Sequence, residues 1–268
     1  MIQVPFLSRK RLEDLEREGV SGVDLCGNGL IVVPSRLFVL RSGEPNRHRD
    51  SRPLNNPYRG RSAMVARTLL IQPRWESLTA LAAKVREAGA ELSLPQVSKA
   101  VQALSEDLVV SKEAGTITLR EPLRLLDELG RAWQQPRIRA RQALRLPAGM
   151  DWATRLSSDA TIKWALTGGL SVTRYTAFSE SGPRVIAVSD VEAATTLLGG
   201  TPEDVPSFAD IELIQTDEAG FFFNNEIDDH GVRWASRLQA WLELQAGDAR
   251  QQSAARDLRG ILLRGARP

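Results

Sequence analysis

Hydrophobic residues recur every three or four positions in three short stretches of the chain, a spacing that predicts amphipathic helices. The predicted helices span residues 62–70, 77–85 and 93–108. Each begins with a serine whose hydroxyl can cap the free amides of a first turn, namely Ser62, Ser77 and Ser93. Residues 109–119 then alternate between polar and apolar positions on both sides of Gly115, which is typical of a hairpin. Three helices followed by a hairpin predict a winged helix-turn-helix.

The third predicted helix has two different faces. One is an apolar stripe of Leu94, Val97, Val101, Leu104 and Leu108. The other is polar and consists of Gln96, Ser98, Lys99 and Gln102, while the acids Glu106 and Asp107 are confined to the C-terminal end. Amide side chains suit base edges and a lysine suits a phosphate, so this face is predicted to enter the major groove of DNA. We also expect Lys112, near the hairpin tip, to contact a phosphate.

The segments before this region predict an N-terminal helix, a β-hairpin and a basic loop. Residues 1–20 predict a helix capped by Ser8, and residues 22–40 predict a hairpin that turns at residues 27–29, with one long second arm. Residues 41–60 have no hydrophobic period and are rich in proline, glycine, asparagine and arginine, which indicates a loop or linker.

The chain after residue 120 predicts one more helix, at 121–133, a basic connector at 137–146, and a second domain. Its expected helices are 151–158, 191–198, 236–245 and 248–263, with a further one starting near Leu170, and residues 189–192 are expected to form a capping box. Its expected strands are the run from Ile162 to Gly168, then 185–188, 208–214, 220–224 and 232–235. This irregular alternation predicts an α+β protein. We expect domains at 1–57, 58–135 and 136–268.

Composition restricts the classes of protein that remain. Of 268 residues 42% are hydrophobic and 25% charged, which is typical of a globular chain. A single cysteine excludes an internal disulfide and a multi-cysteine zinc site, and two histidines argue against a histidine-based metal centre. No apolar run approaches the roughly 18–20 residues that span a bilayer. We therefore expect a soluble, cytoplasmic protein without a cofactor, a metal or a membrane partner.

Charge is unevenly distributed although the net charge is only +2. Residues 41–74 contain eight arginines and two acids, and residues 131–145 contain five arginines and no acid. Both basic runs flank the predicted winged helix, so we expect them to face phosphates. The expected phosphate contacts are Arg61, Arg74, Arg137, Arg139 and Arg141. Residues 180–229 invert the balance, with twelve acids and one arginine.

Two groups of residues raise the possibility of an enzyme. A nucleotidyltransferase places a Gly-Gly turn under a triphosphate and two carboxylates on a neighbouring strand. Gly168-Gly169 precedes Asp190 and Glu192 in that order, but both acids also fit a helix cap and no third carboxylate follows. We therefore expect a degenerate nucleotidyltransferase fold. In a second interpretation Asp24 is the first acid of a metal-dependent nuclease, but the next strand offers neither Glu nor Lys, which favours a turn-stabilising role.

Several segments resemble AbiEi-type transcriptional regulators, the antitoxins of type IV toxin–antitoxin systems. The similar segments are 56–67, the predicted winged helix, Trp164–Ser171, the Phe221–Phe223 run and 236–259, in that order. One departure is Glu243, which stands where an aspartate is usual. The resemblance implies an N-terminal DNA-binding module, a C-terminal regulatory domain, autorepression at the promoter, and neutralisation of a nucleotidyltransferase-type toxin.

The sequence thus predicts a non-enzymatic regulator that binds double-stranded DNA. Three alternative interpretations remain. The first is an enzyme that uses Asp190 and Glu192 as metal ligands. The second is a protein–protein module whose acidic 180–229 surface meets a basic partner. In the third, the helices and hairpin serve only for packing or dimerisation.

Overall fold

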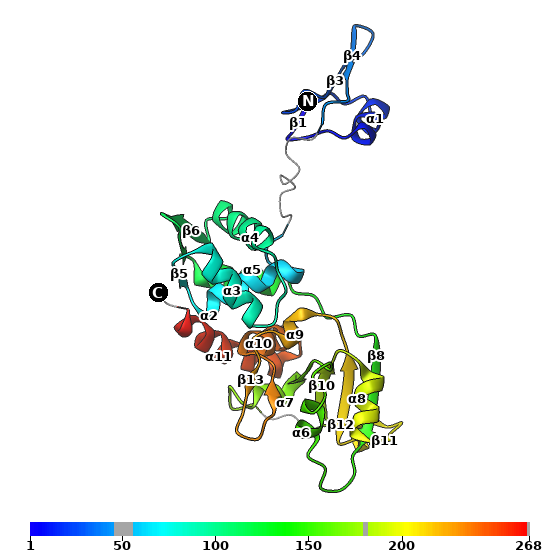
Figure 1. Ribbon diagram of the computed structural model, residues 1–268, viewed down its shortest axis with the longest axis vertical. Helices are drawn as coiled ribbons and strands as arrows, with labels where there is room; N and C mark the ends of the chain where they lie inside the picture. The colour runs from blue at the N-terminus through cyan, green and yellow to red at the C-terminus, as the bar shows by residue number, and fades with distance from the viewer. Residues whose placement is uncertain (46–55, 179–181, 267–268) are drawn as a thin grey trace. The chain divides into compact units, whose positions relative to one another are not determined.

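A computed structural model describes residues 1–45, 56–178 and 182–266. The chain is a mixed α+β protein, and it divides into two compact units, Met1–Leu54 and Asn55–Pro268 (Figure 1). Much of the basic loop expected at 41–60 falls in 46–55, outside the described residues. The two domains expected at 58–135 and 136–268 belong to the same compact unit.

The first unit is a small sheet with one helix. Its elements are β1 (Ile2–Val4), α1 (Arg9–Arg17), β2 (Gly22–Asp24), β3 (Gly29–Val33) and β4 (Leu37–Arg41). The strands lie in the order β1-β2-β3-β4, and β1 pairs with β2 in parallel. The core consists of Leu7, Leu12, Leu15 and Leu30.

Three predictions for this unit can be compared with its backbone. The Ser8 hydroxyl accepts a hydrogen bond from the Arg11 amide at 3.3 Å, which confirms the cap. The helix expected over 1–20 is wrong at its start, because residues 2–4 pair with β2 instead. The hairpin that turns at residues 27–29 is confirmed, but its second arm is not continuous. The chain reverses at Ser35, whose φ is +58°, and β4 returns antiparallel to β3.

In the second unit, residues 58–135 form a helical region that we call the head. Its elements are η1 (Gly60–Ser62), α2 (Ala63–Ile71), β5 (Arg74–Trp75), α3 (Leu78–Glu87), α4 (Leu94–Glu106), β6 (Val110–Glu113), β7 (Thr116–Leu119) and α5 (Pro122–Ala132). Its sheet has the order β5-β7-β6, with both pairings antiparallel. The four predicted helices and the hairpin are confirmed, whereas the short strand β5 was not predicted.

Two local predictions for the head are wrong. Ser62 makes no capping hydrogen bond, because a 3₁₀ turn leads directly into α2 and gives Ser62 a helical backbone. Leu94 and Leu108 do not belong to the buried stripe, since they are 42% and 74% exposed. Leu108 lies just beyond the helix with a φ of +60°, so the chain has left the helical path there. Ser77 does cap its helix, by accepting from the Ala80 amide at 3.1 Å.

Residues 136–266 form the body, which is built on one mixed sheet. Its strands are β8 (Ala140–Arg145), β9 (Trp164–Thr167), β10 (Arg184–Val188), β11 (Thr201–Pro202), β12 (Ile211–Gln215), β13 (Glu226–Ile227) and β14 (Arg233–Trp234). They lie in the order β11-β8-β12-β10-β9-β14-β13. Side chains alternate across β10, so that Ile186 and Val188 join the main core and Ala187 faces a second cluster with Ile214 and Phe221.

The body helices cover this sheet and carry the chain back to the head. They are α6 (Trp152–Ser157), α7 (Gly168–Val172), α8 (Val191–Leu198), η2 (Pro206–Phe208), α9 (Ala219–Phe222), α10 (Arg237–Gln245) and α11 (Ala249–Gly265). Side chains of α6 and α8 complete the main core. In Figure 1, α10 and α11 lie toward the head, where α11 contacts α2.

Three predictions for the body are wrong. Residues 137–146 are not a connector, because residues 140–144 of β8 pair with β12 and Arg145 pairs with β11. The strand expected at 220–224 is the short helix α9 and the residues that follow it. The cap of α8 is Asp190, which accepts from the Ala193 amide at 3.0 Å, while Ser189 instead accepts from the Lys163 amide. The other predicted helices and strands of the body are present, with shifts of a few residues at their ends.

Candidate nucleic-acid interface and basic cleft

Helix α4 exposes part of its polar face. Val97, Ala100, Val101 and Leu104 are buried against the rest of the head. Gln96 and Gln102 are exposed on the opposite face, and Ser98 and Lys99 lie half-buried at its edges. The apolar positions therefore fix the helix while the predicted base-contacting residues remain accessible to a partner.

Two of these polar residues also have roles within the helix. The Oε1 atom of Gln96 accepts from the Ser93 amide at 2.8 Å, which forms a capping box with Ser93. Gln102 donates from Nε2 to Oε1 of Glu106 at 3.0 Å, one turn further along. The capping role of Gln96 was missed in the sequence, although a serine followed three residues later by a glutamine is a known signal for it.

The hairpin β6–β7 presents cations beside the same head. Its tip turns through Ala114 and Gly115, both at positive φ, and Lys112 is exposed on β6. Arg74 is exposed on β5 opposite Thr118 of β7, whereas Lys112 lies opposite Ile117, so the two predicted phosphate contacts stand on one sheet but on its two outer strands and opposite faces. Arg120 is held to this hairpin by a hydrogen bond from its Nε to the Ser111 hydroxyl at 2.8 Å.

The remaining predicted phosphate contacts lie elsewhere. Arg61, Arg137 and Arg139 line a cleft between head and body. Arg139 forms an ion pair with Asp217, and Arg141 pairs with Glu212 at 2.7 Å on the body sheet. The predicted cations are thus split between the sheet of the head, the cleft and the body, and the acidic segment of the body neutralises two of them.

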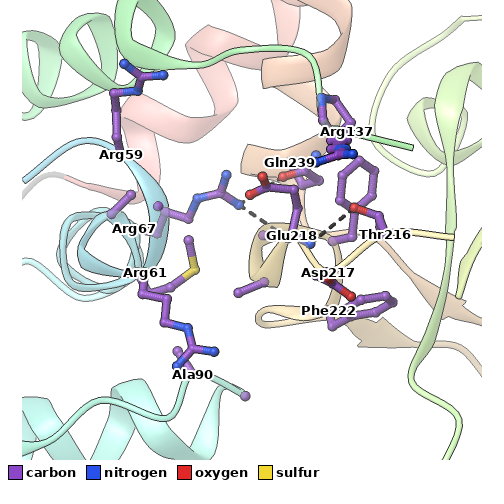
Figure 2. A pocket seen from close by; sticks show the side chains of 18 of the residues that line it. Arg59, Arg61, Arg67, Ala90, Arg137, Thr216, Asp217, Glu218, Phe222 and Gln239 are labelled. Carbon is purple, nitrogen blue, oxygen red and sulfur yellow. Dashed lines mark hydrogen bonds between the residues drawn. The ribbon is translucent and has the colours of Figure 1, made fainter. Parts of the chain in front are cut away.

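This cleft has a volume of about 980 Å³ and a basic lining. Among the described residues that line it, the cations are Arg59, Arg61, Arg67, Arg137, Arg139 and Lys163, and the acids are Glu91, Asp217 and Glu218. Figure 2 shows Arg59, Arg61 and Arg67 projecting from the head and Arg137 from the opposite side. We call this surface the basic cleft.

Arg67 is the least exposed cation of the basic cleft. Its side chain comes from α2, where it stands among apolar neighbours and is 5% exposed. Its Nη1 atom donates to the Gly220 carbonyl at 3.3 Å and to Oε1 of Gln239 at 3.0 Å (Figure 2). Burial lowers the pKa of Arg67 to about 10, although Glu243 and Glu218 oppose part of this shift. In the sequence, Arg67 was counted only as one member of a basic run. The signal that was missed is its position within an otherwise apolar helix, where a charged residue indicates a buried polar contact.

Gln239 connects Arg67 to a buried carboxylate. Its Nε2 donates to Glu243 at 2.8 Å, and the same carboxylate accepts from the Thr167 hydroxyl at 2.7 Å and the Gly168 amide at 3.0 Å. Burial raises the pKa of Glu243, and these hydrogen bonds offset only part of that effect. Glu243 therefore closes the Gly168 turn.

Gly168 and Asp190, the two groups of the nucleotidyltransferase interpretation, do not lie together. In the antiparallel pair β9–β10, Thr167 lies opposite Val185 and Trp164 lies opposite Val188. The Gly168 turn and Asp190 consequently lie at opposite ends of these strands. The Gly168 amide is bonded to Glu243 and Asp190 caps α8, so neither group is arranged with the other around a shared ligand.

Asp24 has a structural role in the first unit. Its carboxylate accepts from the amides of Leu7, Cys26 and Asn28 and from the Asn28 side chain, at 2.7–2.8 Å. Burial alone would raise the pKa of Asp24, but these hydrogen bonds outweigh it, and the pKa lies below its ordinary value. This geometry agrees with the turn-stabilising interpretation.

Neither a metal site nor a membrane-spanning helix is found among the described residues. In the described residues no three His, Cys, Asp or Glu side chains gather as a metal site requires. None of the helices described is both long and apolar enough to cross a membrane. Comparison with protein-family models, curated proteins and solved structures found no match for this chain.

Proposed function

We propose that the chain is a DNA-binding transcriptional regulator whose head is a winged helix-turn-helix. The order helix, strand, helix, helix, strand, strand from α2 to β7 supports this proposal, as does the antiparallel β5-β7-β6 sheet. In such a domain α4 is the recognition helix and the β6–β7 hairpin is the wing. The body regulates and carries out no reaction.

The observation on which the proposal depends is the accessible polar face of α4. Gln96 and Gln102 are exposed while Val97 and Leu104 anchor the helix from behind, so the face can approach a groove without rearrangement of the core. Glutamine amides pair with base edges, and the neighbouring Lys99 suits a phosphate. Since Gln102 bonds Glu106, DNA binding would exchange that hydrogen bond for one to a base.

A cation of the wing completes the proposed surface. Lys112 would contact a phosphate that flanks the groove, because it is exposed on the wing. Arg74 pairs with Thr118 whereas Lys112 pairs with Ile117, so the two side chains leave opposite faces of the sheet and only Lys112 is assigned to this surface. Arg139 and Arg141 are left out of this surface, since acids of the body pair with them.

The resemblance to AbiEi-type regulators extends the proposal to a biological role. We propose that the protein represses its own promoter and that a nucleotidyltransferase-type toxin is its partner. Expression of the tagged chain from its native locus, followed by identification of co-purified proteins, tests the partner. Recovery of the chain without any nucleotidyltransferase would contradict the antitoxin role and leave the DNA-binding role untouched.

The DNA-binding role is tested with fluorescence anisotropy on the duplex upstream of the protein's own gene. We expect the Lys99→Ala/Gln102→Ala variant to bind at least tenfold more weakly, because it loses a phosphate contact and a base contact. Gln252→Ala, an exposed change on α11, is the matched control and should bind like the original chain. Equal binding by all three proteins would exclude α4 as the recognition helix.

A further inference from the structure

We propose that the basic cleft binds a nucleotide-sized organic phosphate. Its volume of about 980 Å³ is at the upper end of the range typical of small-molecule pockets. None of its described lining residues belongs to α4 or to the β6–β7 hairpin. The site is therefore separate from the proposed DNA-binding surface, and the inference does not depend on that function.

The cleft has an excess of positive charge that its own acids do not neutralise. Six described cations line it against three acids, and Asp217 is already paired with Arg139. In the described part of the chain, the side chains of Arg61, Arg137 and Lys163 form no ion pair. Converging cations in a hollow with low-dielectric walls attract anions, so the expected ligand is negatively charged.

Arg67 provides a second and independent reason to expect an anion. This guanidinium is buried, yet its hydrogen bonds from Nη1 go to the neutral oxygens of Gly220 and Gln239. Its Nε atom has no hydrogen-bond partner among the described residues, and Arg67 forms no ion pair there. Glu243 and Glu218 act on this charge without forming an ion pair with it, so its pairing is incomplete, which is unfavourable for a buried charge. A phosphate in the cleft would supply a directly paired negative charge at this position.

The spread of the cations favours an organic phosphate over a single inorganic ion. Arg61 and Arg67 come from the head and Arg137 comes from the body (Figure 2). Lys163 of the body also lines the cleft, so an extended polyanion can contact both sides. Arginine forks bind phosphate oxygens through paired hydrogen bonds. Trp133 and Phe222 also line the cleft and are half-exposed, and such rings allow a base to stack. A nucleoside triphosphate matches these features.

Isothermal titration of the full chain with ATP, GTP, adenosine and inorganic phosphate tests the inference. We expect both triphosphates to bind, inorganic phosphate to bind at least tenfold more weakly, and adenosine to give no heat. The Arg61→Gln/Arg137→Gln variant should weaken triphosphate binding at least tenfold, since both residues are exposed and their loss leaves the core intact. Arg256→Gln on α11 is the matched control and should leave binding unchanged. Circular dichroism establishes that each variant is folded.

Two results would overturn the inference. Triphosphates could give no heat at millimolar concentration, or they could bind the double variant as tightly as the original chain. If triphosphates give no heat and the double variant also weakens duplex binding, the cleft instead extends the nucleic-acid surface. Because the titration contains no DNA, failure of the proposed DNA-binding function would not change its outcome.

Discussion

The side chains of Arg67 and Gln239 meet at 3.0 Å although they are 172 residues apart in the chain. Arg67 belongs to α2 in the head and Gln239 to α10 in the body, so this hydrogen bond joins the head and the body. The neighbouring contacts support the same junction: the Asn224 amide donates to the Ala88 carbonyl at 2.8 Å, and Gln245 donates to the Gly130 carbonyl at 3.3 Å. The head and body are therefore linked by polar contacts as well as by packing.

We predict that Gln239→Leu lowers the free energy of unfolding by about 2–4 kcal/mol. The leucine fills a similar volume but leaves Arg67 and Glu243 without their shared amide partner, and both groups are buried. Urea denaturation followed by tryptophan fluorescence measures the change. Gln252→Leu on the exposed face of α11 is the control, with an expected effect below about 0.5 kcal/mol. Equal effects of the two changes would mean that the buried amide has no special role.

We predict that ionisation of Glu243 makes the protein less stable as the pH rises. The pKa of Glu243 is raised above its ordinary value of 4.5 by burial, so the folded state retains a proton that the unfolded state has lost. Its stabilising contribution is complete below pH 4.5 and disappears as the pH rises through the folded-state pKa. Unfolding free energies measured from pH 4.5 upward should therefore fall for the original chain relative to Glu243→Gln. Glu192→Gln, an exposed change on α8, should give no such difference, and a rise with pH would contradict the argument.

The local pattern of the sequence was sufficient to predict most of the head. The presence and positions of α3 and α4 follow from periodic apolar positions such as Leu81 and Val101, which are buried in the structure, although the predicted C-terminal ends are each two residues off. The pattern failed at Leu108, because a periodic position just beyond a helix end can point to solvent once the backbone takes a positive φ. Strand β5 was missed because it has only two residues, and its pairing with β7 is a tertiary contact.

The basic cleft was less predictable, since its lining comes from distant parts of the chain. Charge counting identified Arg61 and Arg137 as members of basic runs, but it assigned them to DNA. It also included Arg139, whose partner Asp217 lies far along the sequence. Similarly, the Phe221–Phe223 run is apolar enough for a strand, but the chain forms the short helix α9 there. Its Gly220 carbonyl accepts from Arg67, and Phe221 packs with Ala187 and Ile214, which are contacts between distant parts of the chain.

We predict that Asp24→Asn loosens the first unit without affecting the second. The carboxylate accepts four hydrogen bonds, and an asparagine can accept at only one of the two oxygen positions, so we expect a loss of about 1–3 kcal/mol. Hydrogen exchange by mass spectrometry should show faster exchange confined to residues 1–45. Because the pKa of Asp24 is lowered from 3.8, its contribution is present above that pH and is lost as the pH falls through the folded-state pKa. Asp14→Asn, at an exposed helical ion pair, is the control.

We predict that Lys112→Gln reduces the salt dependence of duplex binding by about one phosphate contact. The slope of log K against log salt should become shallower by about 0.9, because one fewer counterion is released. Binding to unrelated duplexes should weaken by a similar factor, since phosphate contacts do not depend on sequence. Lys163→Gln removes a lysine of the basic cleft and should leave the slope unchanged. A change with Lys163→Gln instead would assign the phosphate contacts to the cleft.

We predict that Gly220→Ala destabilises the junction by about 1–3 kcal/mol. A Cβ atom at this position would lie 2.8 Å from both terminal nitrogens of Arg67 and 2.9 Å from Oε1 of Gln239, and these groups are held in a buried network. Gly265→Ala is the control, because a Cβ there meets no atom within 4 Å. The cause can be isolated with a double-mutant cycle in the Arg67→Met background, where the branched guanidinium is absent. If the clash with Arg67 is the reason, the double variant loses less stability than the sum of the two single changes, whereas simple additivity would place the strain elsewhere.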